Sequence, residues 1–251
     1  MAECGRIRTS RWEEQNMGRM DIDMLRRTPA YSYVEAAHYL NLPPSTLSSW
    51  FRGQTYTRDD EIRRFRPVVR LDGKPGEGLS FLNLVEAHVL AAIRREHSVP
   101  LQKVRRALEY VKKKLGIERP LADARFETDG VDLFVRELER LVNVSQEGQL
   151  EIEPVIRRFL KRIERDPSGA PIKLYPFTRK AHSTDEAAPV EIDPRVAFGR
   201  PVLVGRGVPT AVLADRFKAG DSLADLATDY DTSTQSIEEA IRCELTRREA
   251  A

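Results

Sequence analysis

The stretch "YSYVEAAHYLNLPPSTLSSWFRG", Tyr31–Gly53, decides the fold of the N-terminal part of the chain. Its first half predicts a short helix that begins after Ser32, because one face carries apolar residues at helical spacing, namely Val34, Ala37 and Leu40. The segment Asn41–Pro44 ends this helix, since a residue before proline avoids helical backbone angles, and a second helix would start at Pro44 or Ser45. Two short helices around such a turn are typical of a helix-turn-helix.

The second predicted helix has an apolar inner face and a polar outer face. Leu47, Trp50 and Phe51 fall on the inner face, so we expect them to pack in a core rather than stack on bases. Small hydroxyl side chains can approach base edges, and arginines attract the DNA phosphates. The sequence therefore predicts DNA reading by Ser45, Thr46, Ser48, Ser49 and Arg52, with backbone contacts from Arg63, Arg64 and Arg66. The alternative is a packed helical hairpin that does not touch DNA.

A strand-like segment follows the two helices. "RDDEIRRFRPVVRL", Arg58–Leu71, ends in a β-branched run, and the glycine-rich "DGKPGEG" then turns the chain. We interpret this turn as a wing beside the helix-turn-helix. The arginines of the same segment would give this helix-turn-helix a basic surface.

Composition limits the possible functions. The 251 residues include 41% hydrophobic and 32% charged residues at a net charge of +2, so DNA binding must rest on local basic patches. Two distant cysteines and four scattered histidines predict no disulfide framework, no metal site and no cofactor. No apolar run is long enough to span a membrane, and the first residues contain no apolar signal core, which predicts a cytoplasmic protein. Acidic clusters such as Asp59–Glu61 lack a histidine or nucleophile at a useful spacing, so we expect no enzyme activity.

The pattern predicts a mainly α fold with a small antiparallel β-sheet, in the α+β class. We expect a flexible N-terminus over residues 1–28, a winged-helix-like helix-turn-helix over 29–78 and a central α+β region over 79–177. A linker over 178–189 and a small three-helix domain over 190–251 complete the chain. In the central region, helices are predicted for "FLNLVEAHVLAAIRREH", "PLQKVRRALEYVKKKLG" and "EPVIRRFLKRIERD", and strands for "ARFETDG", "VDLFVREL", "RLVNVS", "QLEI" and "PIKLYPF".

The C-terminal segment repeats the apolar skeleton of the opening stretch. A shift of 190 residues places Ser32 on Ser222, Ala37 on Ala227, Leu47 on Ile237 and Phe51 on Ile241. The outward residues of this C-terminal copy are largely acidic, which opposes DNA binding and favours contact with protein. The apolar positions predicted for a homodimer contact are Leu223, Leu226, Ile237 and Ile241.

A glycine-rich stretch, "GRPVLVGRG", precedes the C-terminal copy. A phosphate-cradling loop is one interpretation, but the stretch lacks the lysine and hydroxyl residue that end such loops. The better interpretation is a hairpin whose glycines adopt positive φ angles.

The segment "EIDPRVAFGRPVLVGRGVPTAVLADRFKAGDSLADLATDYDTSTQSIEEAI" resembles a small antitoxin domain long catalogued as a domain of unknown function. Its motif residues are Asp193-Pro194, Gly199-Arg200-Pro201, Gly205, Gly207, Pro209 and Gly220-Asp221-Ser222. Arg206 stands where threonine is common in that pattern. The resemblance covers about one quarter of the chain. The front half is similar to longer, VapB-like members that carry a MerR-like helix-turn-helix, through "GLSFLNLVEAHVL", "RRALEYVKKKLG", "RFETDG" and "LYPF".

The resemblance implies an antitoxin of a type II toxin–antitoxin pair, which neutralises a PIN-like ribonuclease toxin and represses its own operon. Arginines can pair with the carboxylates of a ribonuclease site, and the candidates for toxin binding are Arg206, Arg200 and Arg195, with Arg179 on their approach. Arg206 is the preferred contact, and Arg200 is expected to have a structural role. Two alternatives stay open: a MerR-like, ligand-responsive transcription regulator without a toxin, and a nucleic-acid enzyme.

Overall fold

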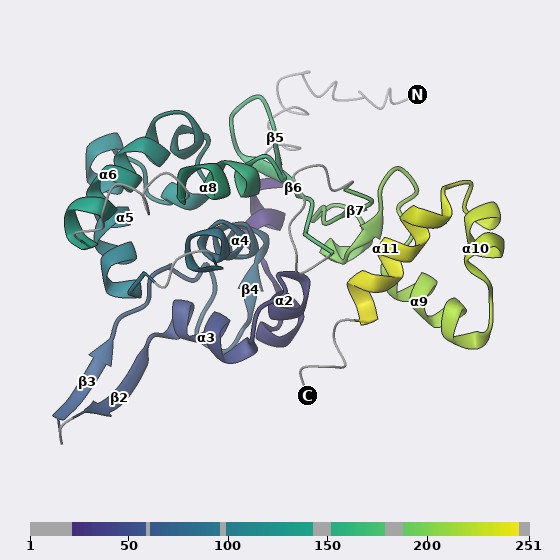
Figure 1. Cartoon of the computed structure of the whole chain (residues 1–251), viewed down its shortest axis with the longest axis horizontal. Helices are drawn as coiled ribbons and strands as arrows, with labels where there is room; N and C mark the ends of the chain where they lie inside the picture. Colours follow the sequence, from purple (N-terminus) through teal and green to yellow (C-terminus); the bar gives the residue numbers. More distant parts are fainter. Residues whose placement is uncertain (1–21, 59–60, 96–98, 143–151, 179–187, 246–251) are drawn as a thin grey trace, which may run out of the picture.

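The computed structural model describes residues 22–58, 61–95, 99–142, 152–178 and 188–245. Its elements are mostly helices, and its strands form four antiparallel two-stranded sheets, which confirms the α+β class. The helix-turn-helix and the central region form one body, and three C-terminal helices form a smaller one beside it (Figure 1). Within the described ranges, we find no helix with the length and apolar character needed to cross a membrane.

The N-terminal copy has the predicted two helices. Strand β1 (Pro29–Tyr31) leads into α2 (Tyr33–Tyr39), and α3 (Pro44–Arg52) follows the proline turn. Ser32 caps α2 in a capping box, because its side chain accepts from the Glu35 N–H and the Glu35 carboxylate accepts from the Ser32 N–H. Strand β1 pairs with β4 (Leu79–Ser80), which ties the start of the motif to the start of the central region.

The wing lies elsewhere than the glycine-rich turn. Strands β2 (Gln54–Arg58) and β3 (Glu61–Phe65) form an antiparallel hairpin that follows α3 directly. The prediction of a wing at "DGKPGEG" is therefore wrong, and of the strand-like "FRPVVRL", Phe65–Leu71, only Phe65 lies in a strand. That run is apolar because Val69 packs in the core, at 5% exposure, and not because it joins a sheet.

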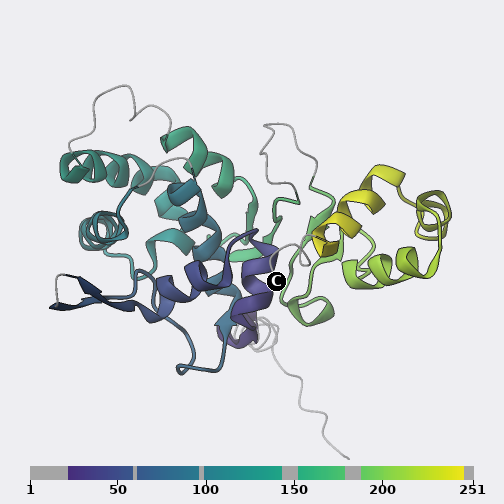
Figure 2. The same cartoon turned by 60° about the horizontal axis from the view of Figure 1, so that its bottom comes forward.

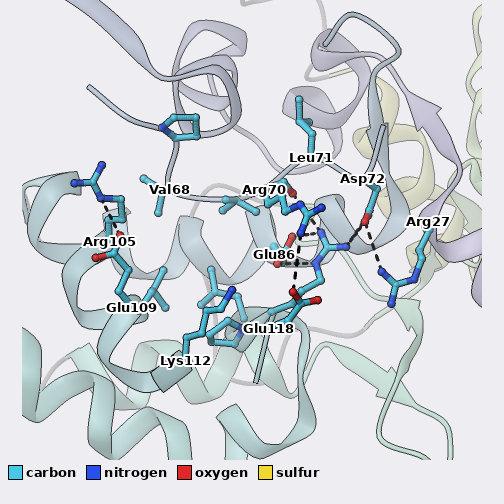
Figure 3. Close-up of a pocket in the computed structure, with 16 residues that line it drawn as sticks. Arg27, Val68, Arg70, Leu71, Asp72, Glu86, Arg105, Glu109, Lys112 and Glu118 are labelled. Atoms are coloured by element: carbon cyan, nitrogen blue, oxygen red, sulfur yellow. Dashed lines mark hydrogen bonds and ion pairs between the residues drawn. The ribbon is translucent and has the colours of Figure 1, made fainter. Parts of the chain in front are cut away.

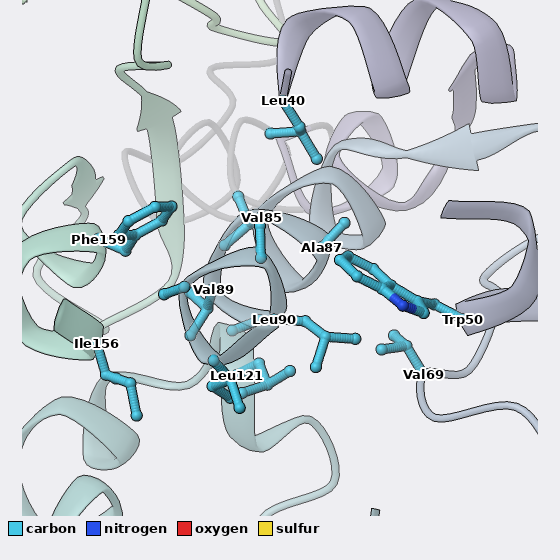
Figure 4. Close-up of a cluster of buried hydrophobic side chains, with 14 of the residues drawn as sticks. Leu40, Trp50, Val69, Val85, Ala87, Val89, Leu90, Leu121, Ile156 and Phe159 are labelled. Carbon is cyan, nitrogen blue, oxygen red and sulfur yellow. The ribbon is translucent and has the colours of Figure 1, made fainter. Parts of the chain in front are cut away.

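Helix α4 (Phe81–Arg95) forms the centre of the larger body. Every residue from Phe81 to Ile93 is buried, as expected of a helix that is apolar nearly all round. Figure 4 shows Leu40 and Trp50 of the helix-turn-helix on one side of α4, and Ile156 and Phe159 on another. Around it lie α5 (Leu101–Leu115), α6 (Val131–Val142), α8 (Ile152–Leu160), β5 (Ile163–Arg165) and β6 (Pro171–Leu174).

Of the strands predicted for the central region, "PIKLYPF" is confirmed, because its first four residues form β6 and pair with β5. Two others are wrong. "ARFETDG" and "VDLFVREL" form a short π-helical turn, Phe126–Gly130, and the helix α6. Its buried residues recur at helical spacing, namely Val131, Phe134, Val135 and Leu138. Read as separate short runs, these residues look β-like, and only the continuous twelve-residue window reveals the helix. "QLEI" and the end of "RLVNVS" lie mostly outside the described residues.

Of the segment predicted to be flexible, the structure describes residues 22–28. Residues 22–27 form a helical turn, and Arg26 is buried at 5% exposure. Its guanidinium lies 2.5 Å from the Asp166 carboxylate, in the turn between β5 and β6. The prediction of a flexible segment up to residue 28 is wrong for these residues, and residues 1–21 lie outside the described ranges.

The C-terminal body has its own core. Strands β7 (Val190–Glu191) and β8 (Val202–Leu203) pair, and the helices are α9 (Thr210–Ala219), α10 (Leu223–Asp229) and α11 (Thr234–Leu245). Leu226, Ile237 and Ile241 lie inside this core, at 0%, 0% and 3% exposure, while Leu223 packs against its edge. The predicted homodimer contact needs these side chains on the surface, and the folded domain does not offer the three buried ones there.

The two helix-turn-helix copies match in backbone detail. Helices α2 and α10 have the same bounds after a shift of 190 residues, and α3 and α11 begin at matching positions. A capping box at Ser222 repeats the one at Ser32. The turn residues Asn41 and Asp231 both adopt positive φ, at 58° and 46°. The repeat predicted from the sequence is therefore confirmed as a repeated local structure.

Direct contacts join the two bodies. The backbones of Leu174 and Ile192 form an antiparallel bridge, and the Thr178 hydroxyl donates a 2.5 Å hydrogen bond to the Glu239 carboxylate. The buried Tyr31 hydroxyl donates to the Gly199 carbonyl at 2.9 Å. The segment predicted as a linker therefore connects two domains that touch, and residues 179–187, with Arg179, lie outside the described ranges.

Candidate nucleic-acid interface

Helix α3 is held by its inner face. Leu47, Trp50 and Phe51 are 0%, 0% and 3% exposed, so they form the core contact that the sequence predicts for them. Pro44 occupies the first helical turn, where its missing N–H costs nothing. The opposite face of α3 is left for a partner.

The five predicted base-reading residues come together on that opposite face. Ser45 and Arg52 are exposed, and Thr46, Ser48 and Ser49 are half-buried. The Ser49 hydroxyl donates to the Thr46 carbonyl at 2.7 Å, which fixes its rotamer. The Arg52 guanidinium lies 4.4 Å from the centre of the Tyr33 ring, a cation–π contact that holds it at the end of the helix. This set of short hydroxyls with one arginine suits the edge of a DNA groove.

A glycine joins α3 to the wing. Gly53 adopts φ 73°, and a Cβ there would lie 2.2 Å from the Phe65 carbonyl oxygen. The Val68 and Val69 N–H groups both donate to the Trp50 carbonyl, at 2.8 and 3.2 Å. The chain thus leaves α3, makes the hairpin and returns to α3, so that helix and wing form one unit.

The wing projects from one end of the molecule. Figures 1 and 2 both show the β2–β3 hairpin extending from the larger body, at the end opposite α9–α11. Positions 63 and 64 pair with Tyr56 and Thr55 in the hairpin register, which puts the predicted backbone contacts Arg63 and Arg64 on the wing. Arg66 follows the hairpin and is exposed. A helix and a ribbon of this kind can engage a groove and its neighbouring phosphates together.

Further exposed cations lie on the segment that follows the wing and on α5, and their meeting at one cavity was not predicted. Arg70 has a side chain 87% exposed, and Lys112–Lys114 are exposed in the last turn of α5. Arg70 and Lys112 line the same cavity, beside the chain that returns from the hairpin. No spacing rule could have paired them, because they come from separate elements of the fold.

That cavity has a volume of about 450 Å³ and lies between residues 67–72 and α5 (Figure 3). At its inner wall, Arg119 reaches Asp72 at 2.6 Å and Glu86 at 2.5 Å. Burial raises the pKa of Glu86, and pairing with Arg119 opposes that rise. Since one cation meets two carboxylates, the wall is polar and fixed in shape. Among the described residues, no group of three or more histidine, cysteine or acidic side chains could hold a metal ion.

The three predicted toxin-binding arginines lie on the C-terminal body, and each faces a carboxylate. Arg195 binds the buried Asp193 at 2.6 Å, and this hydrogen bonding outweighs burial to lower the pKa of Asp193. Arg206 binds the Asp231 carboxylate at 2.7 Å and also its carbonyl, so it braces the turn of the C-terminal copy. Arg200 lies 3.7 Å from Glu35 of α2, and its side chain is 62% exposed, the most accessible of the three.

The glycines around these arginines adopt the expected positive φ angles, 75° at Gly199, 72° at Gly205 and 65° at Gly207. At Gly199 a Cβ would lie 2.4 Å from the Tyr31 hydroxyl, so this position needs glycine for a close approach as well as for its backbone angle. The hairpin interpretation of these glycines is confirmed.

Two protein families match parts of the chain. Residues 29–108 match a family described as "Putative DNA-binding HTH domain", which spans the helix-turn-helix, the wing and α4–α5. Residues 190–242 match a "Protein of unknown function" family that covers β7 to α11.

Similar proteins match over most of the chain. From Mycobacterium tuberculosis, "Putative antitoxin VapB45" is 28% identical over 89% of this chain and 97% of its own length. An uncharacterized protein of the same organism, Rv2308, is 27% identical over 88% of this chain and 92% of its own. The crystal structure of Rv2018, also from M. tuberculosis, superposes with a TM-score of 0.61 at 23% identity, over 85% of this chain and 97% of that one. The chain therefore shares its fold with a solved mycobacterial protein.

Proposed function

We propose that this chain is the antitoxin of a type II toxin–antitoxin pair. It binds operator DNA through α3 and the β2–β3 wing, represses its own operon, and neutralises a PIN-like ribonuclease through its C-terminal body. The observation that carries the DNA-binding half is the outer face of α3, where five polar residues stand next to an arginine-bearing wing. The toxin-binding half draws support from the relative described as an antitoxin, which aligns over 97% of its length.

Binding to the DNA upstream of its own gene tests the repressor role. Arg52→Ala should weaken specific binding by about 1–3 kcal/mol if Arg52 reads a guanine, and leave binding to unrelated DNA nearly unchanged. Arg140→Ala is a matched control, because Arg140 is an exposed arginine on α6 that pairs only locally, with Glu137. Equal loss of specific and unrelated binding for Arg52→Ala would count against base reading.

A two-fold operator and a homodimer belong to this proposal, because one helix-turn-helix module buries little DNA surface. The dimer contact has to use residues other than the buried Leu226, Ile237 and Ile241. Light scattering on the full chain, free and bound to operator DNA, measures the number of copies. One copy per operator at saturation would contradict a dimer.

The toxin-binding role is assigned to the C-terminal body and its arginines Arg195, Arg200 and Arg206. Co-expression with the protein of the adjacent reading frame tests this role through rescue of growth and co-purification. A truncation after Pro189 should lose both effects. If residues 1–189 still rescue growth and retain the partner, the neutralising surface lies in the larger body.

A second candidate is a MerR-like, ligand-responsive regulator without a toxin, and the cavity between residues 67–72 and α5 favours it. Its wall includes the chain that returns from the wing, so an occupant there could alter the wing. Leu108→Trp would fill the cavity, since Leu108 lines it and is 7% exposed. The test is a reporter gene under the operator, expressed with the native chain or with Leu108→Trp. Reporter expression that changes with the growth medium for the native chain, but not for Leu108→Trp, would favour this function over the first.

A further inference from the structure

One exposed aromatic residue stands out on the C-terminal body. Phe198 is 93% exposed, more than any other large hydrophobic side chain in the part of the chain that the structure describes. Single exposed apolar residues are common on protein surfaces, and exposure alone carries no meaning. Two further features set Phe198 apart from such residues, namely its backbone conformation and the charged residues around it.

The backbone at Phe198 is strained. Ala197, Phe198 and Gly199 adopt positive φ angles in succession, 47°, 57° and 75°. Bulky residues rarely enter this region, because Cβ crowds the following carbonyl. The other two described non-glycine residues with positive φ, Asn41 and Asp231, are of the types that tolerate it. Strain of this kind persists only where surrounding structure enforces it, and it gathers at functional sites.

The loop Asp193–Arg200, here named the Phe198 loop, is fastened at several points. The Val196 N–H donates to Asp193, the Gly199 N–H to Val196 and the Arg200 N–H to Ala197, at 2.9–3.1 Å. The Gly199 carbonyl accepts from the Tyr31 hydroxyl, which anchors the loop to the larger body. Phe198 is therefore displayed on a rigid support, which lowers the entropy lost when a partner binds it.

Arginines flank Phe198 with their charges outward. In the Arg195–Asp193 pair the side-chain exposures are 41% and 2%, and in the Arg200–Glu35 pair they are 62% and 26%. In both pairs the guanidinium is the accessible member. An aromatic residue between accessible arginines has the composition of an interface hot spot. It complements an apolar socket with an acidic border.

The position of the loop favours a protein over DNA as its occupant. The loop belongs to the C-terminal body, which lies at the end of the molecule opposite the wing (Figure 2), and it meets the larger body at Tyr31 and Glu35 rather than at α3 or the hairpin.

We propose that Phe198 is the anchor by which this chain grips its toxin, inserting into an apolar socket bordered by carboxylates while Arg195 and Arg200 face that border. The inference rests on the proposed antitoxin function and identifies the residue at the centre of the contact. A ribonuclease whose site gathers carboxylates around a metal ion would supply the acidic border.

The test uses the full chain and the tagged, purified protein of the adjacent reading frame. Phe198→Ala should weaken binding about 30-fold, as expected of a hot-spot residue. Phe198→Gly should lose as much binding while its melting temperature stays the same or rises, because glycine accepts the positive φ. Phe217→Ala is the matched control, since Phe217 is 40% exposed on α9 of the same body, and its binding should change less than about threefold.

Each result decides between the claims. If the native chain binds and Phe198→Ala binds equally well, the inference is wrong and the antitoxin function stands. If the native chain does not bind the adjacent protein, the toxin-binding function falls, and this inference with it. Light scattering and operator titration of the same variants cover the other occupants. A native dimer that Phe198→Ala dissociates, or operator binding that Phe198→Ala alone weakens, would overturn the inference.

Discussion

At the scale of single residues, one contact across the junction between the two bodies joins a tyrosine to a glycine. Burial raises the pKa of Tyr31, so its hydroxyl stays protonated and continues to donate to Gly199 at any ordinary pH. Gly199 lies so close beneath that hydroxyl that a side chain cannot fit. The glycine of a short Gly-Arg-Pro motif therefore serves a contact between domains, beyond its own loop.

Gly199→Ala should destabilise the chain by about 2 kcal/mol or more, from the positive φ and from the 2.4 Å approach to Tyr31 Oη. Tyr31→Phe alone should cost about 1 kcal/mol through the lost hydrogen bond. The double variant should be less destabilised than the sum, because removing the hydroxyl removes the clash. Urea unfolding of all four proteins measures this cycle, and strictly additive losses would contradict the assigned contact.

At the scale of elements, the wing and α3 act as one unit and supply most of the proposed DNA contacts. Gly53 and the Trp50 carbonyl fix the angle at which the hairpin leaves the helix. Arg66 stands just beyond the hairpin, where it can reach a phosphate without reading a base.

Arg66→Gln should weaken binding to operator and unrelated DNA alike and reduce the salt slope by about one, because one fewer counterion is released. Titrations at several salt concentrations measure that slope. Arg158→Gln on α8 is the control in the larger body, away from α3. A loss confined to operator DNA would mean that Arg66 reads sequence rather than charge.

A second element-scale contact is sensitive to acid. Burial alone would raise the pKa of Asp166, but hydrogen bonds from Ser168, Arg26 and the Ala170 N–H lower it from 3.8 to about 2. A carboxyl with a depressed folded pKa stabilises the fold above its unfolded pKa and loses that contribution as pH falls through the folded value. The contribution is therefore complete above about pH 5 and disappears between there and about pH 2.

Asp166→Asn should consequently flatten the fall in unfolding free energy over this acid range, and should separate the helical turn 22–27 from the β5–β6 turn. Denaturant unfolding at several pH values measures the difference between the variant and the native chain. Asp215→Asn, at an exposed position on α9, serves as the control. Identical acid dependence in the native and Asp166→Asn proteins would show that the pair contributes nothing.

At the scale of the whole molecule, the chain has two cores that share no residue, one around α4 and one within the C-terminal body. Polar contacts at Tyr31, Thr178 and Arg200 connect them, along with the Leu174–Ile192 bridge. Ile192, which follows β7, also packs in the core around α4. Such an interface couples two folding units without merging them.

Calorimetry of the full chain should therefore show two unfolding transitions. Leu226→Ala should lower only the C-terminal transition and Leu90→Ala only the other, since each leucine is fully buried in one core and its truncation costs about 2–5 kcal/mol. A single transition that both variants shift equally would mean that the two bodies unfold together.

The sequence predicted elements whose signals are local. The helix-turn-helix, its inner-face core and the 190-residue repeat depend on periodicity and capping within short windows, and all three are present. The glycine-rich "DGKPGEG" has the stronger turn signal, but the wing is formed by "QTYTR" pairing with "EIRRF". Helix α6 has a helical spacing of apolar residues only over its full length, and its shorter pieces alternate as a strand would.

Contacts between distant segments could not be predicted from local patterns in the sequence. No local sequence pattern predicts that Tyr31 contacts Gly199, or that Arg200 pairs with Glu35. The exposure of Phe198 could not be predicted for the same reason. A phenylalanine in such a sequence is expected in the core, whereas Phe198 has a left-handed backbone and is exposed.

The β2–β3 hairpin has a consequence for how binding can be watched. Its two strands pair with each other alone in the described structure, and an isolated two-stranded ribbon is only marginally stable in water. Its amide hydrogens should therefore exchange with heavy water far sooner than those of the buried α4. If DNA binds there as proposed, it would slow that exchange, and the uptake of deuterium between Gln54 and Phe65 would then measure the fraction of time for which the DNA is bound.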